Sequence, residues 1–426
     1  MKILIIGNGG REHAFAWKCS QSNKVKKIFI APGNGGTAQE NKVQNINIGA
    51  EDSVELLRFA IKENIDLTII GPEVPLVKGI VDNFNDAGLS CFGPTADAAQ
   101  LEGSKSFTKD FLQRHKIPTA DYKTFSESEA AIDYIHSKGT PIVIKADGLA
   151  AGKGVVVAMT INEATDAVKN ILDDDTFGEA GAKIVVEEFL EGEEASYIVI
   201  TDGNQVVSLA TSQDHKARDN GDLGPNTGGM GAYSPAPVIT QDLDQRVMNE
   251  IIHPTLSGLK KDGINYLGFL YAGLMIDDAG NPKVLEYNCR FGDPETQPIM
   301  MRLKSDFVEL LLATINGSLS DHSVIWSEDV ALGVVMAAGG YPIKYESGHT
   351  INGLVGIDSE NIKVFHAGTS LKERKILTSG GRVLCVVGKG KTTHEAQKAS
   401  YAAVEKINWN DEFHRSDIGY RAIERE

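Results

Sequence analysis

Short apolar runs alternate with helical patterns through the first hundred residues of the chain. The apolar runs predict strands at residues 2–6, 28–31, 67–71 and 90–92. The helical patterns lie at residues 14–20, 53–64 and 77–87. Because a helix separates successive strands, the strands should be parallel, with right-handed crossovers. We therefore expect an open α/β sheet whose ligand lies beyond the carboxyl ends of its strands.

The following region mixes helices and strands. Ser104 can cap a helix that continues through His115. Further helices are expected at residues 126–138, 162–172, 242–261 and 306–316, with Ser126 opening the first of them. Further strands are expected at residues 141–145, 155–159, 183–188, 197–201, 268–276 and 283–287. This order indicates an α+β region rather than a second parallel sheet.

Part of this region, residues about 122–192, forms a compact α+β unit. Its strand at 141–145 ends on Lys145, and a glycine-rich turn joins that strand to the next in a hairpin-like pair. The unit is small enough to move as a lid over a site at the strand end.

The last hundred residues have short strands separated by glycine-rich turns. One amphipathic helix follows them, at about residues 394–407. We expect a small mainly-β domain here, without a catalytic group of its own. The chain then divides into an N-terminal α/β domain at 1–103, a central domain at 104–327 and a C-terminal domain at 328–426.

Composition narrows the function classes. The chain has 426 residues, 42 % of them hydrophobic, and 44 glycines, which favours several α/β domains. Its net charge of −16 and the lack of a basic run argue against a nucleic-acid partner. No apolar stretch approaches the roughly 20 residues of a membrane span, and Gly7 ends the only N-terminal apolar run, so neither a membrane span nor a signal peptide is expected. The four cysteines are widely spaced, as in a reducing cytoplasm.

Many charged side chains gather in the segment 284–295, VLEYNCRFGDPE. Glu286 and Asn288 alternate along a predicted strand, so they point to the same face. A carboxylate and an amide oxygen on one face suit a hard cation such as Mg²⁺. Arg290 can reach a phosphate or carboxylate beside it. An edge strand that enters a charged turn is the alternative, but Arg290 and the Gly-Asp-Pro-Glu that follows favour a site.

A glycine-rich turn, GNGGREHA at residues 7–14, joins the first strand to the first helix. Glycines let the backbone approach a phosphate, and the helix N-terminus offers N–H groups. The dinucleotide pattern needs a glycine where Glu12 stands, and the second strand runs into Pro32-Gly33-Asn34 rather than onto an acid for a ribose. We expect a single phosphate, with a tight turn as the alternative.

Glu73 follows the third long strand, where it can bind sugar hydroxyls or cap the next helix.

The loop GLAAGKG at residues 148–154 is not a P-loop. Three residues separate Gly148 from Gly152, Gly154 replaces the Ser/Thr, and the loop joins two strands. A mobile flap over phosphates explains it better, with Lys145 as the fixed cation. A surface lysine in a flexible turn is the alternative.

Residues 187–194 hold five acids in eight positions. Such a run is usually a solvated surface. Here it follows a strand and includes Phe189 and Leu190, so the departing backbone can meet a purine edge and a later Glu can bind ribose.

A long polar loop combines Asp214-His215-Lys216 with the glycine-rich stretch 224–231. Loops of this length in a compact domain are often functional. Asp214 and Lys216 could bind an amine and a phosphate, whereas His215 is expected to be structural.

Together these motifs resemble the ATP-grasp ligases, and within them the phosphoribosylamine–glycine ligases. The matching segments, in the family's order, are GNGGREHA, APGNGGT, GPEVPL, LEGSKSF, IKADGLAAGKGV, EEFLEGEEAS, QDHK, GPNTGGMGAYSP and LEYNCRFGDPE. They cover nearly the whole chain. The resemblance implies an ATP-dependent ligation of glycine to 5-phosphoribosylamine through glycyl phosphate, in cytoplasmic purine biosynthesis. It also implies transient contact with the enzyme that supplies phosphoribosylamine.

The resemblance further implies residue roles, with Arg290 and Lys145 as the catalytic residues. Glu286 and Asn288 would hold Mg²⁺ or Mn²⁺. The ATP-binding residues would be Lys105, Lys145, Gly152, Glu187, Glu188, Leu190 and, on the ribose, Glu194 or Glu193. The phosphoribosylamine and glycine site would consist of Asn8, Gly9, Gly10, Glu73, Asp214, Lys216, Arg290, Asp293 and Glu295.

Two positions depart from the family's pattern. Members commonly read D-H-K-R, but here Ala217 follows Lys216 and the arginine comes next, as Arg218. A substrate contact by that arginine would be shifted or lost. Many ATP-grasp enzymes also have an acid on the strand that precedes the Glu-x-Asn strand, and residues 269–275 have none. The metal ion would then rely more on ATP oxygens and water.

Three alternatives remain open. Another ATP-grasp carboxylate–amine or carboxylation enzyme of purine metabolism would differ in its acceptor. A non-catalytic nucleotide-binding regulator should have lost one of the residues Lys145, Glu286, Asn288 and Arg290. An NAD-dependent enzyme is disfavoured by Glu12 and by the missing ribose acid.

Overall fold

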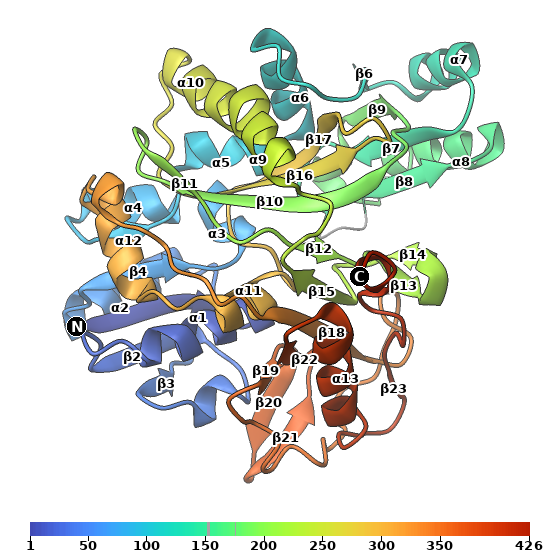
Figure 1. The fold of residues 1–426 in the computed structure, drawn as a ribbon. Helices are drawn as coiled ribbons and strands as arrows, with labels where there is room; N and C mark the ends of the chain where they lie inside the picture. Colours follow the sequence, from blue (N-terminus) through green and yellow to red (C-terminus); the bar gives the residue numbers. More distant parts are fainter. Residues whose placement is uncertain (151–153, 175) are drawn as a thin grey trace.

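The first hundred residues form an open parallel sheet with the strand order β3-β2-β1-β4-β5. The computed structural model describes residues 1–150, 154–174 and 176–426, and this sheet is drawn in blue in Figure 1. The strands are β1 (Lys2–Gly7), β2 (Lys27–Pro32), β3 (Val43–Asn45), β4 (Leu67–Ile70) and β5 (Cys91–Phe92). The helices are α1 (Gly10–Ser20), α2 (Ser53–Glu63), α3 (Glu73–Val77), α4 (Ile80–Asp86) and α5 (Ala96–Gly103). The predicted parallel α/β sheet is confirmed.

Two helices in this region differ from the sequence prediction. Helix α1 begins at Gly10 rather than at residue 14, because the Glu12 carboxylate accepts a hydrogen bond from the Gly9 N–H (2.6 Å) and orders the first turn. The helix expected at 77–87 is present but shorter, as α4: α3 ends at Val77, and Gly79, just before α4, has a φ of +77°, which favours glycine.

Two antiparallel sheets build the central region, with the strand orders β6-β9-β7-β8 and β11-β10-β16-β17. The first contains β6 (Tyr122–Phe125), β7 (Ile142–Ala146), β8 (Val155–Ala158) and β9 (Ile184–Glu188). The second contains β10 (Glu193–Thr201), β11 (Val206–Ser208), β16 (Gly268–Ile276) and β17 (Pro282–Asn288). The helices are α6 (Lys105–Arg114), α7 (Ser128–Lys138), α8 (Ile161–Leu172), α9 (Gln241–Val247), α10 (His253–Lys261), α11 (Thr296–Arg302) and α12 (Phe307–Ile315). Antiparallel pairing in both sheets agrees with the predicted α+β character.

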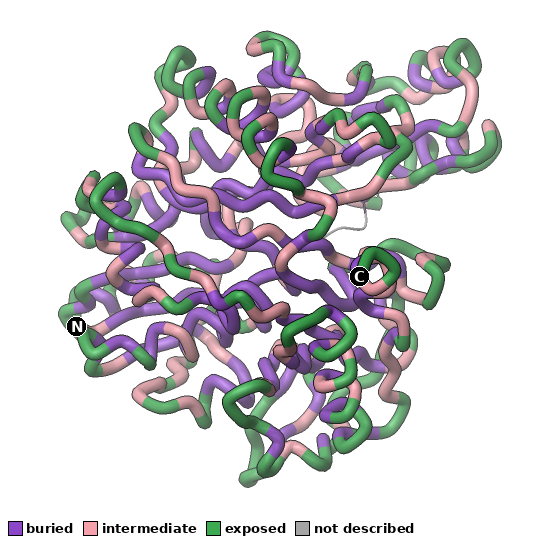
Figure 2. Tube along the Cα trace, in the orientation of Figure 1, coloured by how far each residue is buried: buried purple, intermediate pink, exposed green. Residues whose placement is uncertain are grey.

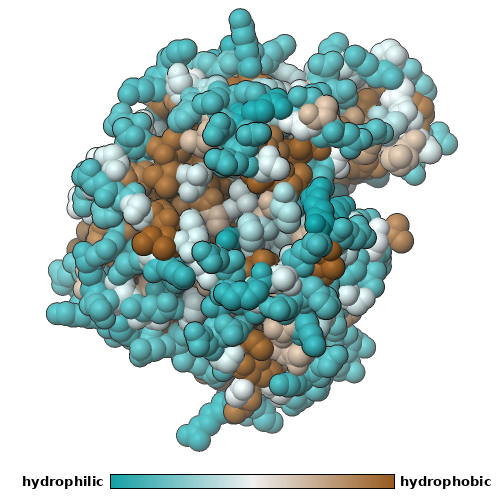
Figure 3. Space-filling view, viewed as in Figure 1, coloured by the Kyte–Doolittle hydropathy of each residue, from teal (hydrophilic) through white to brown (hydrophobic). Residues whose placement is uncertain are grey.

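The first sheet and the helices α7 and α8 form a lobe, here called the lid. The lid has its own hydrophobic core, which includes Ile135, Ile144 and Val168. In the space-filling view it stands out from the body with a notch beneath it (Figure 3). A separate core is what a unit needs if it is to move as one body.

Helix boundaries in the central region follow tertiary contacts more than local pattern. Ser104 caps α6 as expected, accepting a hydrogen bond from the Phe107 N–H (3.2 Å). Ser126 does not open α7, because the preceding residues are held in β6 by pairing with β9. The long helix expected at 242–261 is interrupted between α9 and α10 by a π-helical segment, Met248–Ile252.

A further sheet, with the order β12-β15-β18-β22-β19, contains the C-terminal strands. Its strands are β12 (Gln213–Asp214), β15 (Gly231–Ser234), β18 (Val330–Ala338), β19 (Ile362–His366) and β22 (Arg382–Gly390), and β23 (Glu412–Phe413) pairs with β18. Two hairpins lie beside it, β13 (Ala217–Asp219) with β14 (Leu223–Asn226), and β20 (Thr369–Lys372) with β21 (Lys375–Thr378). Helices α13 (Thr393–Val404) and α14 (Tyr420–Ile423) complete a mainly-β region, as predicted. Figure 2 shows that burial is concentrated along inner strands of the large sheets, such as β1, β10 and β18.

Candidate active site

A cavity of about 530 Å³ lies between the lid and the β16–β17 turn, and we call it the lid cavity. Its lining residues are Asp121, Tyr134, Lys138, Gly139, Pro141, Ile142, the segment 187–191, Met275, Asp277, Asn281 and Lys283. Among them are Glu187, Glu188 and Leu190, which the sequence predicted to surround a purine. A mixed apolar and polar lining of this size suits a flat heterocycle.

Glu187 lies at the inner wall of the lid cavity and is almost completely buried. Its Oε2 accepts a hydrogen bond from Lys145 Nζ (3.0 Å) and lies 2.8 Å from Lys109 Nζ. Its Oε1 is buried without a hydrogen-bond partner in the described part of the chain. A buried acceptor without a partner is costly unless a ligand supplies the donor.

Lys109 was missed by the sequence prediction. It lies four residues after Lys105 on α6, so both side chains share one helix face. That spacing was a usable signal, although an isolated lysine on a helix is normally solvated.

Lys105 stands at the first position of α6, and its Nζ donates to the Gly148 carbonyl (3.0 Å). The adjacent Asp147 accepts a hydrogen bond from the Ser106 N–H (2.6 Å), which ties the start of the glycine-rich loop to α6. Burial lowers the pKa of Lys105, with Glu286 opposing that shift. Gly152, predicted to bind ATP, lies outside the described residues.

Glu286 is the point at which cations from separate elements converge. Burial would raise the pKa of its carboxyl, but Lys216, Lys145, Lys105 and Arg290 together hold it below its ordinary value. Lys216 Nζ lies 3.9 Å from Glu286 Oε1. An ionised carboxylate in this position is ready to bind a cation.

Glu286 and Asn288 stand at alternate positions near the end of β17, as expected. Both supply oxygen, which suits a hard divalent ion. The described residues contain no group of three or more His, Cys, Asp or Glu side chains able to hold a metal ion. Strand β16 likewise adds no acid. The two oxygens of Glu286 and Asn288 fit a metal ion that takes its other ligands from a bound nucleotide and water.

Arg290 is held between two carboxylates. Its Nε lies 3.2 Å from Glu73 Oε2 and its Nη2 lies 2.9 Å from Glu102 Oε1. Glu102 also accepts a hydrogen bond from the Cys289 N–H (2.9 Å). Burial lowers the pKa of Arg290, but Glu102 and Glu73 more than reverse that and keep the guanidinium charged. Glu73 therefore binds an arginine rather than capping α3, and Glu102 is a site residue that the sequence did not reveal.

The glycine-rich turn at residues 7–10 is shaped by Glu12. Its carboxylate accepts hydrogen bonds from the Gly9 N–H and from Arg11 Nε, both at 2.6 Å. A Cβ at Gly7 or Gly71 would overlap the Glu12 side chain, so these positions require glycine for close approach. The residue that breaks the dinucleotide pattern thus orders the turn itself.

Asp293 brings the 284–295 segment to this turn. Its Oδ2 accepts a hydrogen bond from the Arg11 N–H (3.4 Å) at the start of α1. Burial would raise the pKa of Asp293, but Arg382 and Arg11 hold it below its ordinary value. The following helix, α11, is buried along its whole length, which fixes the segment in the body.

Asp214 and Lys216 also lie near Glu286. Lys216 Nζ pairs with Glu194 Oε2 at 2.8 Å. Burial raises the pKa of Asp214 to about 8. The negative charge of Glu295 adds to this rise, whereas the positive charge of Lys216 opposes it. Glu295 is buried and accepts hydrogen bonds from the hydroxyls of Tyr271 (2.8 Å) and Ser196 (3.1 Å).

Glu193 and Glu194 are neighbours on β10, so their side chains point to opposite faces of the sheet. The Glu193 carboxylate turns away to Gln213 (2.6 Å) and Arg425 (2.8 Å). Only Glu194 pairs with Lys216 beside Glu286. Glu188 also lies at the rim, 3.8 Å from Lys283.

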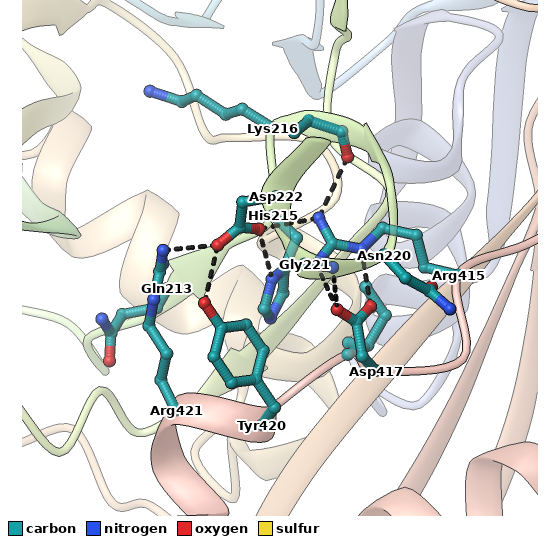
Figure 4. A network of polar contacts seen from close by, with 12 residues as sticks. Gln213, His215, Lys216, Asn220, Gly221, Asp222, Arg415, Asp417, Tyr420 and Arg421 are labelled. Atoms are coloured by element: carbon teal, nitrogen blue, oxygen red, sulfur yellow. Dashed lines mark hydrogen bonds and ion pairs between the residues drawn. The ribbon is translucent and has the colours of Figure 1, made fainter. Parts of the chain in front are cut away.

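The loop that carries Lys216 is fastened by the C-terminal segment (Figure 4). The Asp222 carboxylate accepts hydrogen bonds from Arg415 (2.8 Å), Tyr420 (2.7 Å) and Arg421 (2.5 Å). His215 is buried, and its Nε2 accepts a hydrogen bond from the Gly419 N–H (3.0 Å), which is a structural contact as expected. Arg218 pairs with its neighbour Asp219.

Three family models match successive parts of the chain. They are described as the phosphoribosylglycinamide synthetase N domain (residues 1–102), ATP-grasp (A) domain (103–296) and C domain (331–421). The biotin carboxylase domain of the Hydrogenobacter thermophilus 2-oxoglutarate carboxylase, described in complex with MgADP, shares the fold, with a TM-score of 0.76 at 16 % identity over 97 % of this chain and 91 % of that one. The fold and the site together define an ATP-grasp enzyme, a class that uses ATP with a divalent metal ion.

Full-length relatives narrow this class. The phosphoribosylamine–glycine ligase of Escherichia coli strain K12 is 62 % identical over the whole of both chains, and that of Vibrio cholerae is 60 % identical over all of this chain and 99 % of its own. The crystal structure of the Thermotoga maritima phosphoribosylamine–glycine ligase has a TM-score of 0.83 at 33 % identity, covering 98 % of this chain and all of the other. The chain belongs to the phosphoribosylamine–glycine ligase family and is an ATP-dependent carbon–nitrogen ligase. No helix among its described residues is long and apolar enough to cross a membrane.

Proposed function

We propose that the chain joins glycine to 5-phosphoribosylamine, with conversion of ATP to ADP and phosphate, to give glycinamide ribonucleotide in purine biosynthesis. The observation that carries this proposal is the positive surroundings of Glu286: Lys216 Nζ lies 3.9 Å from its carboxylate, and Lys105, Lys145 and Arg290 act with Lys216 to hold its pKa low. These cations come from α6, the lid, the 214–231 loop and the segment after β17. A site that gathers them suits a triphosphate and an anionic acceptor at once.

The lid cavity is the proposed ATP site. The unpartnered Glu187 Oε1 suits the exocyclic amine of adenine, and Glu188 and Leu190 lie beside it. Glu194 is the better candidate than Glu193 for the ribose, because Glu193 is engaged by Arg425 on the opposite face. Lys105 and Lys145 then contact the phosphates. The role of Gly152 stays a prediction from the resemblance.

Glu286 and Asn288 are the proposed ligands of Mg²⁺ or Mn²⁺. When bound there, the ion would offset negative charge on the phosphates as the phosphoryl group is transferred. The described residues provide few protein ligands for the ion, which suits an ion that binds together with the nucleotide.

The chemistry then needs two displacements. A carboxylate oxygen of glycine attacks the γ-phosphorus of ATP, forming glycyl phosphate and releasing ADP. The unprotonated nitrogen of phosphoribosylamine attacks the glycyl carbonyl carbon. Phosphate then leaves, and the nitrogen releases a proton as the amide forms. Arg290, fixed by Glu73 and Glu102, stabilises the oxyanions, while Lys145 stabilises the transferring phosphoryl group. Closure of the lid, residues about 122–192, keeps water from the acyl phosphate.

The glycine-rich turn and the loop at 214–231 are the proposed substrate site. Asn8, Gly9 and Gly10 stand at the N-terminus of α1, a position that favours an anion. The remaining proposed residues are Glu73, Asp214, Lys216, Arg290, Asp293 and Glu295. We also propose a cytoplasmic location, which the four buried free thiols support, and transient contact with the enzyme that supplies phosphoribosylamine.

The test is ADP formation with Mg²⁺, glycine and freshly generated phosphoribosylamine, each omitted in turn. The proposal expects strict dependence on all of them and an amide product. ADP formation that ignores phosphoribosylamine would mean another acceptor, as in a different ATP-grasp enzyme. Tight ATP binding without turnover would contradict the proposal and favour a regulator.

A further inference from the structure

Two lysines share one carboxylate oxygen at the inner wall of the lid cavity. Lys109 Nζ lies 2.8 Å and Lys145 Nζ 3.0 Å from Glu187 Oε2. The three side chains are only 3 %, 8 % and 2 % exposed, respectively. Lys109 comes from α6, whose apolar side chains belong to the core of the body, whereas Lys145 and Glu187 come from β7 and β9 of the lid. The cluster therefore joins lid and body.

The two lysines differ in their other hydrogen-bond partners. Lys109 Nζ donates to Thr119 Oγ1 (2.7 Å), and Thr119 in turn donates to the Val284 carbonyl (2.7 Å). Lys145 donates to the Leu285 carbonyl at a longer 3.2 Å. Lys109 is thus tied to the body by a short chain of hydrogen bonds, while Lys145 stands at the strand end that faces the phosphate region.

A carboxylate as deeply buried as Glu187 needs a positive partner at all times, because an unpaired buried charge is strongly destabilising. With one lysine only, that lysine could not turn to a phosphate without leaving Glu187 unpaired. With two, one lysine can leave while the other remains. Because both lysines contact the same oxygen and the cluster has a net positive charge, one lysine can leave Glu187 while the other still neutralises it.

We propose that Lys109 is a positioning residue that stays on Glu187 and thereby releases Lys145 to the phosphates of the bound nucleotide. This inference rests on the proposed function, in which Lys145 contacts ATP. Lys109 acts through Glu187 and does not itself touch the nucleotide. Burial lowers the pKa of Lys109 to about 8 and Glu187 opposes that shift, which agrees with its dependence on this carboxylate.

The test compares nucleotide binding by calorimetry in the wild type and in Lys109→Met, which removes the charge and nearly preserves the volume. We expect the Kd of ATP and of ADP to rise at least tenfold, and that of adenosine to change less than twofold, because adenosine does not need Lys145. Lys169→Met, at an exposed lysine on α8 of the lid, is the matched control and should leave all three unchanged. An equal loss of affinity for ATP and for adenosine, or no loss of affinity for ATP, would overturn the proposal.

A second comparison separates an indirect role from direct contact. Glu187→Gln removes the carboxylate that requires a partner, so adding Lys109→Met to it should weaken ATP binding by less than about threefold. If Lys109→Met still weakened ATP binding tenfold in the Glu187→Gln protein, Lys109 would bind the phosphates itself. That result would overturn the inference. If thermal unfolding shows that Lys109→Met does not fold, Lys109→Gln retains a polar group near Thr119 and carries the same expectation.

These readouts are independent of the ligase reaction. Wild-type protein that binds ATP but forms no amide would contradict the proposed function, and the Lys109 variants would still decide the present inference. Ligation that proceeds normally together with an unaffected Kd in Lys109→Met would contradict the inference alone.

Discussion

The guanidinium of Arg290 has two roles because one of its partners, Glu102, has a side chain that is only 7 % exposed. Glu102 lies in the interior, where burial raises its pKa and Arg290 works against that rise. Glu73 is tied to the same guanidinium. Removing Arg290 therefore withdraws a charge from the proposed reaction and a counter-ion from Glu102, and a useful experiment must separate the two effects.

Arg290→Ala is expected to lower kcat by about 10²–10³, the usual cost of losing a charge-stabilising donor. A control variant, Glu102→Gln, removes the carboxylate that Arg290 neutralises but keeps the guanidinium, so its kcat should fall much less. Steady-state kinetics with thermal unfolding in parallel makes the comparison. A loss below about tenfold in Arg290→Ala would exclude Arg290 as a catalytic residue.

Glu286→Ala is expected to raise the Mg²⁺ or Mn²⁺ concentration needed for half-maximal activity far more than it raises the KM for glycine. The reason is that Glu286 supplies one of only two proposed protein ligands. Metal titrations at saturating glycine, repeated with Glu328→Ala at an exposed position as control, measure this. The reverse pattern, a large change for glycine and a small one for metal, counts against the metal assignment.

At the scale of single residues, the sequence predicted candidate site residues best where those residues are close together along the chain. Glu286, Asn288 and Arg290 share one short segment, and their spacing alone predicted a cation beside an arginine. Lys109 and Glu102 were missed because their partners, Glu187 and Arg290, lie far away in the sequence. The spacing of Lys109 from Lys105 places both on one face of α6, but it does not show that Lys109 is buried against a distant carboxylate.

Elements were predicted well where periodicity is strong and less well at their ends. The apolar β1, β4, β7 and β16 were found because a buried strand needs no partner to be recognised in sequence. The short polar strands β3 and β12 were not, since pairing rather than composition makes them strands. The predicted domain boundaries remain proposals.

The hairpin β13–β14 illustrates how one element depends on another far along the chain. It follows Lys216 directly, and its turn holds Asp222, which Arg415 and Arg421 bind from the C-terminal segment. Arg415 is almost completely buried and also pairs with Asp417 (2.8 Å). The position of Lys216 is therefore set partly by residues two hundred positions later.

Arg415→Met is expected to lower the free energy of unfolding by about 1–3 kcal/mol, the usual effect of leaving buried polar groups without a partner. Because the hairpin loosens, the KM values for phosphoribosylamine and glycine should rise more than that for ATP, and proteolysis near residues 219–224 should accelerate. Arg374→Met, at an exposed turn residue, is the control. An unchanged proteolysis pattern would contradict this view of the hairpin.

At the scale of the whole molecule, histidines join the first region to the last. His13 of α1 accepts at Nδ1 a hydrogen bond from the His366 N–H of β19 (2.7 Å), and its Nε2 lies 3.1 Å from Glu40. Lys363 also pairs with Glu40. Burial lowers the pKa of His13, and burial with the nearby His13 lowers that of His366 to about 3.

These shifts predict a loss of stability in acid. Both histidines are neutral in the fold, so their contribution is complete above the unfolded pKa of about 6.5 and is lost as the pH falls toward the folded values. Glu40, whose pKa is lowered to about 2 by His13 and Lys363 despite burial, adds a further loss below about 4.5. Each histidine contributes at most about 1.4 kcal/mol per pH unit.

Chemical denaturation between pH 7 and pH 4.5 measures this slope. His366→Gln should reduce it, whereas His322→Gln, at an exposed position, should not. A slope that is the same in all three proteins would contradict the prediction.

Strand β15 lies in the central region by sequence, yet it pairs along its length with β18, from Gly231 opposite Val334 to Ser234 opposite Ala331. A chain split between residues 327 and 328 would divide one hydrogen-bonded ladder between two polypeptides. Each fragment would present an unpaired sheet edge and would tend to aggregate when made alone. Produced together, the fragments could reassemble through that ladder, so split halves of this enzyme should regain activity only by complementation.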